Sequence, residues 1–539
     1  MDIIVSLDQI QWDERGTKNF YWPINYSDIL AIRNRLLASL VPFIHTSVAA
    51  DVRYGKILQM AAGHFVAEIM ALYQGYILCR ECNAAGHSLR VPPQYRYWNA
   101  IEKETVPPPS PFLISLAAGV PRTSNQIKTI LRKLRWDLAF NGLTPQIALP
   151  FNAKHHIMTL TNAELIHQHA HSISDVVRLS LREDWFPPLA KYRNKVFDDT
   201  SLPTEQINFI DSLLDIVNSE FIVTGEGMPE YIAQYIRHWL IEVINTVGSH
   251  FDNLLEQSHQ IPHRLWTGTS SSIWATLLRS VTRHFGGHVT RHDHGNGLAH
   301  LDPQYQQLIT FNECDEFVTY NDAQATATEL TINPSLILQT QRPRIASAQN
   351  FKRPASKSVQ PSKSSSSLIH SVMYPATIYD GDRMHLVPLL ADVVALDWQV
   401  RLFSHLQSWN IQVVHKPHPG GQNFAPAQFA EGFGHRTLLE PFEQVKDQAD
   451  AYIFDLPQST TFSIALATDK PVILIDLGFF DWVADARELM EKRCRVVRGW
   501  FDAKNRVQVD WDQLHTALTD QRTEQDTSFV DKYCVNTTT

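Results

Sequence analysis

The sequence predicts an α/β fold with two Rossmann-like lobes that face each other across a cleft, preceded by a large, mostly helical region. Strand-like and helix-like runs alternate over residues 264–340 and again over 371–497. Such alternation is typical of parallel sheets. A basic, serine-rich segment separates the two blocks, and the chain before them shows apolar residues at helical spacing. These observations predict two sheets and a helical N-terminal part.

Residues 1–260 form the mostly helical N-terminal region. Apolar residues recur there every three or four positions, which predicts helices at 29–44, 48–79, 160–181 and 228–255. The prolines Pro107–Pro109 divide this region, because consecutive prolines cannot continue a helix. Cys79 and Cys82 have CxxC spacing but no second pair, so we interpret them as structural cysteines of a reducing cytoplasm.

Residues 261–340 are predicted to form the N-terminal Rossmann-like lobe. A strand ending near Gly268 leads to a helix at 273–285, and a second strand follows at 288–292. The glycine-rich loop 293–297 comes next. Two further short strands are expected, at 308–311 and 316–320.

Residues 368–539 are predicted to form the C-terminal lobe, which would bind a donor nucleotide. Its elements alternate in order: strand 372–375, helix 397–409, strand 411–415, strand 451–454, helix 461–468 and strand 472–476. Between the lobes, residues 341–367 carry six basic side chains and no acidic one. We expect a flexible, solvated linker there, with contact to anionic lipid head groups as the alternative.

Overall composition restricts the classes of function. The formal net charge of -9 argues against binding nucleic acid through a basic surface. The chain starts without a basic, then apolar, leader and contains no run of eighteen apolar residues. We therefore expect a cytoplasmic protein, with peripheral contact at the inner membrane as a further option through the basic linker.

Lys416 and His418 are the first candidates for binding a ligand. They belong to a Lys-Pro-His-Pro-Gly turn that directly follows a strand. In open α/β sheets, ligands bind at the carboxyl ends of strands. Lys416 supplies a positive charge there, and the flanking prolines restrict the backbone around His418, so both residues suit a phosphate. The alternative is an ordinary polar turn.

Ser459, Thr460 and Thr461 open a helix after the next predicted strand of that lobe. Hydroxyls and unpaired amides at a helix start attract phosphate. Simple capping of the helix is the competing interpretation. Glu440 lies near the predicted cleft, where its carboxylate suits a ribose or sugar hydroxyl, and turn formation is its alternative.

Asp293 and His294 follow a strand of the other lobe, where a carboxylate or imidazole suits a general base. The neighbouring run from Arg291 to His294 does not suit a metal, since alternate strand residues face opposite ways. His167, His169 and His171 likewise lack a carboxylate on the same helical face, and we interpret them as surface histidines. No metal site is expected, and the chemistry is expected to need no cofactor.

The order of these motifs resembles a known group of enzymes. Thr269–Ser271 before a helix, His294-Gly295, Tyr374–Tyr379, Lys416–Pro419 and Ser459–Thr461 with Ala465–Pro471 occur in that order. The pattern is similar to GT-B glycosyltransferases of bacterial surface-polysaccharide (O-antigen or capsule) synthesis. It looks closest to a leptospiral-type O-antigen putative transferase family and to transferases with an HP motif that use CMP- or CDP-activated donors.

The resemblance implies a donor nucleotide site made by Lys416, His418, Ser459, Thr460 and Thr461, to which we add Glu440 and Tyr379. It also implies catalysis by His294 or Asp293 from the facing lobe, with the helical region on the acceptor side. The expected activity transfers a sugar, best a CMP-activated ulosonic acid such as Kdo or a sialic-acid-like nonulosonate, to a glycan or lipid-linked glycan. A CDP-polyol phosphotransferase, a nucleotide-sugar epimerase and a noncatalytic scaffold of a polysaccharide assembly complex remain alternatives.

Overall fold

The computed structural model describes most of the chain. The described residues are 4–6, 20–50, 53–91, 93, 95–110, 112–113, 156–161, 163–172, 178–181, 202–223, 227–268, 272–294, 297–302, 304–348, 369–379, 390–418, 429–483, 485–520 and 526–534. Parts of the predicted motifs lie outside them, namely Thr269–Ser271, Gly295, Asn296, Pro419, Gly420 and residues 349–367 of the predicted linker.

The C-terminal part contains a seven-stranded sheet with the order β12-β11-β10-β13-β14-β16-β17. Its strands are β10 (Ser371–Pro375), β11 (Gln412–Lys416), β12 (Arg436–Thr437), β13 (Ala451–Phe454), β14 (Val472–Asp476), β16 (Arg495–Phe501) and β17 (Val507–Val509). All neighbours are parallel except β16 and β17. The chain runs outward from β10 to β11 and then returns to β13 on its other side. This reversal creates a topological switch point between β10 and β13, where open α/β sheets bind ligands.

A second sheet has six strands, all parallel, in the order β4-β3-β5-β6-β8-β9. Its strands are β3 (His156–Thr159), β4 (Arg178–Leu181), β5 (Arg264–Thr267), β6 (His288–His292), β8 (Glu316–Thr319) and β9 (Arg344–Ser347). The order reverses between β3 and β5, so this sheet also has a switch point. The protein is therefore a mixed α/β fold with two parallel, Rossmann-like sheets.

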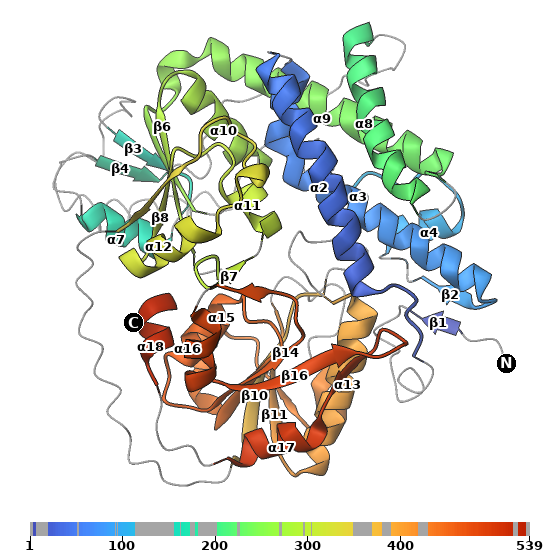
Figure 1. Cartoon of the computed structure of the whole chain (residues 1–539), viewed down its shortest axis with the longest axis vertical. Helices are drawn as coiled ribbons and strands as arrows, with labels where there is room; N and C mark the ends of the chain where they lie inside the picture. Colours follow the sequence, from blue (N-terminus) through green and yellow to red (C-terminus); the bar gives the residue numbers. More distant parts are fainter. Residues whose placement is uncertain are drawn as a thin grey trace.

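The remaining helices and strands flank the two sheets or form a helical part beside them (Figure 1). The helical N-terminal part comprises α2 (Tyr26–Ala49), α3 (Arg53–Ala84), α4 (Arg96–Glu102), α8 (Thr204–Ile222) and α9 (Glu230–Glu256), with the short strands β1 (Ile4–Ser6) and β2 (Ser88–Arg90). The six-stranded sheet is accompanied by α7 (Glu164–Ser172), α10 (Ile273–His284), α11 (Gln304–Thr310), α12 (Asp322–Thr331) and strand β7 (Leu301–Asp302). The seven-stranded sheet is accompanied by α13 (Asp392–Ser408), α14 (Phe442–Val445), α15 (Thr460–Leu466), α16 (Ala486–Arg493), α17 (Trp511–Thr519), α18 (Ser528–Tyr533) and strand β15 (Asp481–Trp482). Short 3-10 turns occupy Ser258–Gln260, Pro334–Leu336, Phe429–Phe433 and Lys446–Gln448.

Close packing explains why α3 is buried around most of its circumference. It contacts α2, α4, α9 and α10 at once. A Cβ at Gly75 would lie only 2.4 Å from Cδ1 of Trp98, so glycine is what lets α4 approach the helix. At the start of α2, the Asn25 side chain accepts a hydrogen bond from Ser27 N at 2.8 Å and caps the helix. No helix within the described ranges is long and apolar enough to cross a membrane.

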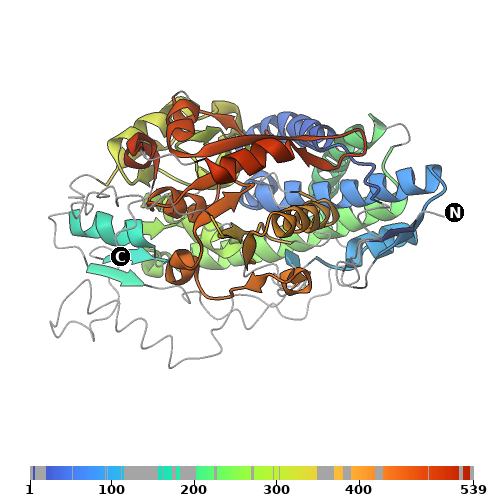
Figure 2. The same ribbon diagram turned by 90° about the horizontal axis from the view of Figure 1, so that it is seen from below.

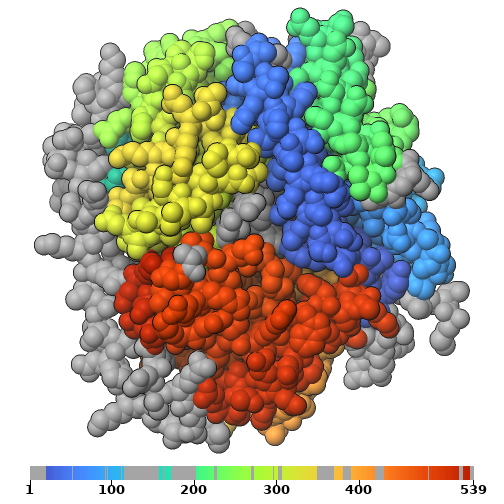
Figure 3. Space-filling view, viewed as in Figure 1, coloured from blue at the N-terminus to red at the C-terminus, as the bar shows by residue number. Residues whose placement is uncertain are grey.

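The sheets and the helical part are joined by direct contacts. β7 pairs with β15 in an antiparallel register, so the two sheet regions share a small β-ribbon. α18 packs on α12, where Gln324 donates a hydrogen bond to Tyr533 O at 3.0 Å. Figure 3 shows α2 (blue) reaching the surface of the C-terminal part (red). The ring centroids of Tyr26 and Phe479 are 4.3 Å apart at this contact. Seen from below in Figure 2, β3 and β4 (teal) lie at the opposite end of the molecule from α2 and α3 (blue).

Three expectations about local structure are wrong. Residues 308–311 were expected to be a strand, but the unbranched residues before them extend helix α11 over Gln304–Thr310. The helix expected over 160–181 is confined to α7, and its C-terminal end instead forms β4 beside β3. Within the predicted flexible linker, Arg344–Ser347 forms β9, the edge strand of the six-stranded sheet. In the last two cases pairing with a distant strand decides the local structure.

Candidate functional site

Lys416 is the last residue of β11 and lies at the carboxyl edge of the seven-stranded sheet. Its side chain is 8% exposed, and Nζ donates to Pro417 O at 3.3 Å. Leu438 N donates to His415 O at 2.9 Å, which brings the exposed Glu440 beside the end of β11. Burial lowers the pKa of Lys416, and Glu440 opposes that shift. The structure therefore brings these two predicted residues together.

His418 lies two residues beyond β11, and its side chain is exposed. It follows Lys416 past the end of a strand that directly neighbours β10. β11 and β13 are both neighbours of β10, so the ends of these strands are roughly 10 Å apart. His418 and the start of α15 accordingly share one edge of the sheet.

Ser459, Thr460 and Thr461 are half-buried at the start of α15, directly after β13. The Ser459 hydroxyl accepts a hydrogen bond from Phe462 N at 3.1 Å, so this residue caps the helix. The Thr460 hydroxyl donates to the backbone carbonyl of His294 at 3.3 Å. The loop after β6 of one sheet therefore contacts the helix that follows β13 of the other.

Asp293 and His294 form that loop after β6. The Asp293 side chain is buried, and its Oδ1 accepts a hydrogen bond from His294 N at 2.7 Å. The imidazole of His294 retains an exposed surface while protein atoms surround its other side. This partial desolvation lowers the pKa of His294, and the Asp293 carboxylate opposes the shift. A neutral imidazole at neutral pH is able to accept a proton.

Tyr379 does not join the other predicted residues in an open site. Its side chain is 6% exposed, and its hydroxyl donates to Gln399 Oε1 of α13 at 2.8 Å. Burial raises its pKa well above the ordinary tyrosine value. Nearby, Asp455 accepts hydrogen bonds from Tyr374 and, at 3.1 Å, from Trp398 Nε1, and burial raises its pKa. The polar side chains at the switch point are therefore buried and hydrogen-bonded to one another.

His169 is not the surface residue that the sequence indicated. Its ring stacks on Trp266 with centroids 4.5 Å apart, and its Nδ1 lies 2.9 Å from His292 Nε2. His292 is fully buried, and burial lowers its pKa to about 3. Among the residues that the structure describes, no group of three or more His, Cys, Asp or Glu side chains is arranged to hold a metal ion.

Cys79 and Cys82 lie in α3 and are buried. Burial raises the pKa of Cys79 to about 12 and that of Cys82 to about 11. Thiols at neutral pH with such pKa values are poor nucleophiles. Burial and the raised pKa values both disfavour a reactive thiolate at these two positions.

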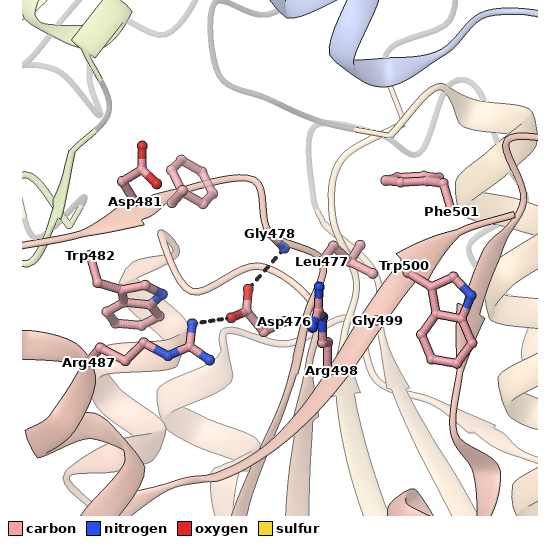
Figure 4. A pocket seen from close by; sticks show the side chains of 11 residues that line it. Asp476, Leu477, Gly478, Asp481, Trp482, Arg487, Arg498, Gly499, Trp500 and Phe501 are labelled. Atoms are coloured by element: carbon pink, nitrogen blue, oxygen red, sulfur yellow. Dashed lines mark hydrogen bonds and ion pairs between the residues drawn. The ribbon is translucent and has the colours of Figure 1, made fainter.

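A pocket outside the predicted site opens at the carboxyl ends of β14 and β16 (Figure 4). Its volume is about 690 Å³. Asp476, Arg487 and Arg498 lie in a row between Trp482 and Trp500. The sequence did carry a signal, since Asp476-Leu-Gly478 follows a strand just as the Lys416 turn does.

Comparison with known proteins gives this chain no family. No protein-family model matches it, and no curated protein matches it. The arrangement of residues at the two sheet edges is therefore the basis for a functional interpretation.

Proposed function

We propose that this protein is a nucleotide-sugar-dependent glycosyltransferase with the GT-B arrangement, two Rossmann-like lobes facing each other across a cleft. The observation that carries the proposal is the hydrogen bond from Thr460 to the carbonyl of His294, at 3.3 Å. It joins the carboxyl edge of one parallel sheet to that of the other, and such edges are where α/β sheets bind ligands.

In this proposal the donor nucleotide binds to the C-terminal sheet. Lys416 and His418 bind the phosphate oxygens, and their positive charge or hydrogen bonds stabilise the leaving group as the bond to the sugar breaks. The start of α15, at Thr460 and Thr461, contributes further donors. Glu440 binds a hydroxyl of the ribose or sugar. Tyr379 takes a supporting role, because its hydroxyl is bonded to Gln399 in the core.

His294 acts as the general base on the acceptor hydroxyl. Its lowered pKa keeps the imidazole neutral at pH 7, and Asp293 positions it by accepting a hydrogen bond from its backbone. The sugar is transferred to a glycan or lipid-linked glycan acceptor of the cell surface, in the cytoplasm or at the inner membrane. A CMP-activated ulosonic acid is the first donor to examine, in agreement with the motifs described above.

The test is release of free nucleotide when the full chain is mixed with CMP-, CDP-, UDP- and GDP-activated donors and candidate acceptors. We expect turnover with one nucleotide class and a loss of at least about 100-fold in kcat for His294→Ala, since general bases contribute that much. His259→Ala alters an exposed histidine before the amino end of β5, away from the carboxyl ends of the strands, and serves as the control that should keep full activity. Absence of release across the panel, or full activity of His294→Ala, would contradict the proposal.

A further inference from the structure

The pocket at β14 and β16 has the size of a small-molecule site. Its volume of about 690 Å³ falls within the range typical of ligand pockets. β14 and β16 are the third and fourth strands from β11, so the pocket lies roughly 14–19 Å from the end of β11 along the same sheet edge. It is therefore separate from the proposed phosphate site at Lys416.

Arg498 provides the pocket with a positive charge that has no ion-pair partner among the described residues. Asp476 of β14 is its register partner, yet the Asp476 carboxylate is occupied by Arg487 Nη1 at 2.6 Å and by Gly478 N at 3.0 Å. Arg498 is exposed and forms no ion pair or hydrogen bond with any described part of the chain. The only free cation of the row in Figure 4 is thus directed at the pocket and not at the protein.

Trp500 places an aromatic surface beside that charge. It is 45% exposed and stands two residues from Arg498, so both side chains lie on one face of β16. Gly499 between them faces the other way. A Cβ there would lie 2.5 Å from Leu477 Cδ2, which shows how closely β16 packs against the segment that follows β14. Arg498 and Trp500 are therefore held toward the pocket by a packed backbone.

Trp482 lies on the opposite side of the charged row from Trp500 (Figure 4). It belongs to β15, which pairs with β7 of the region around the other sheet. Two aromatic walls, a bonded Asp476–Arg487 pair and one free guanidinium match the chemistry of a sugar ring that carries an acid group. The apolar face of the ring packs on an indole, and a carboxylate forms two parallel hydrogen bonds with the arginine fork.

We infer that this pocket is a subsite for an acidic sugar residue of the acceptor glycan, held by Arg498 and Trp500. The role as acceptor subsite rests on the proposed glycosyltransferase function, whereas binding of the acidic sugar itself does not. A nucleotide would also stack its base on tryptophan and pair its phosphate with Arg498. Competition with a nucleotide therefore separates the two occupants.

The experiment measures binding of a disaccharide that ends in glucuronic acid, and of the matching neutral disaccharide that ends in glucose, by calorimetry and saturation-transfer NMR. We expect the acidic disaccharide to bind at least about tenfold more tightly, the effect of one charge-assisted pair. Arg498→Gln should abolish that preference, and Trp500→Ala should weaken both ligands. Arg342→Gln, which removes one exposed charge elsewhere, should bind like the wild type.

Saturating CMP distinguishes this subsite from the nucleotide site. We expect the affinity for the acidic disaccharide to stay within twofold when CMP is present. Equal affinity for the two disaccharides, unchanged binding by Arg498→Gln, or displacement by CMP would each overturn the inference. A chain that binds the acidic disaccharide but releases no nucleotide from any donor would contradict the proposed function and leave the sugar subsite standing.

Discussion

Basic side chains lie near the carboxyl ends of the strands in both parallel sheets, but they differ in their exposure to solvent. In the six-stranded sheet, Arg291 and His292 are fully buried at the end of β6. The Arg291 guanidinium donates to Ile309 O at 2.5 Å and to Gly268 O at 3.3 Å. In the seven-stranded sheet, His418 and Arg498 are exposed. Basic side chains beside the C-terminal sheet are therefore more accessible to a ligand than Arg291 and His292.

Beside the N-terminal sheet, one buried carboxylate pairs with two basic side chains. Glu313 is fully buried and pairs with Lys56 at 2.5 Å and with Arg283 at 3.2 Å. Arg279, also fully buried, lies near it, and burial lowers the pKa of Arg279 well below its ordinary value. Burial alone would raise the pKa of Glu313, but Lys56 and Arg283 overcome that effect and lower it.

Glu313→Gln should therefore cause the largest loss of stability. Removing the acid takes the ion-pair partner from Lys56 and the nearby negative charge from Arg279, whereas Arg283 keeps Asp315 at 2.9 Å. Breaking a buried pair costs about 3–5 kcal/mol, and we expect the lower end because Lys56 is partly exposed. Urea unfolding at pH 7 measures the change in free energy. Glu329→Gln removes an exposed acid that pairs with Arg342 and should cost under about 0.5 kcal/mol. Similar losses in both variants would show that the buried charges of the N-terminal sheet are not structural.

His300, which is buried in the contact between the two sheet regions, makes the stability of the protein depend on pH. Its ring packs against Trp482, Phe529 and Tyr533, and burial lowers its pKa to about 4. The ring lies near the backbone of Pro457, but neither nitrogen has a partner with hydrogen-bond geometry in the described structure. The folded protein therefore excludes a proton that the unfolded chain binds below about pH 6.5.

Stability should consequently fall as the pH falls from 7 toward 4, because the unfolded state binds more protons. At pH 5 the contribution of His300 is a loss of about 2 kcal/mol relative to pH 7. His300→Phe keeps the aromatic packing and removes the titration, so its unfolding free energy should vary less with pH by that amount. Chemical unfolding at pH 7 and pH 5 tests this. An equal pH dependence in wild type and variant would refute the assignment.

The sequence predicted strands well where apolar runs were short and bounded. The strands 288–292 and 451–454 occur as expected, because β-branched and aromatic residues there lie between turn residues. It failed where pairing with a distant strand decides the outcome, as at β4 and at β9 inside the predicted linker. The order of the strands, which creates the two switch points, follows from tertiary packing and not from local pattern.

The candidate site was predictable only in part. Lys416 and His418 lie at the end of a strand that the sequence predicted, whereas Glu440 follows β12, which the sequence did not predict. The enclosure of Tyr379 was not predictable, because it depends on α13 covering the region and on the hydrogen bond to Gln399. The pocket at Arg498 was not predictable either, since its aromatic walls come from β15 and β16, which no single motif connects.

Binding of CMP to the wild type and to Lys416→Met tests the central claim most directly, namely that the carboxyl edge of the C-terminal sheet binds the nucleotide phosphate. Lys504→Met, which alters an exposed lysine in the turn between β16 and β17, is the matched control. We predict that Lys416→Met weakens CMP binding by about tenfold, the loss of one charge-assisted contact, while Lys504→Met binds like the wild type. Equal dissociation constants for the wild type and Lys416→Met would contradict the account.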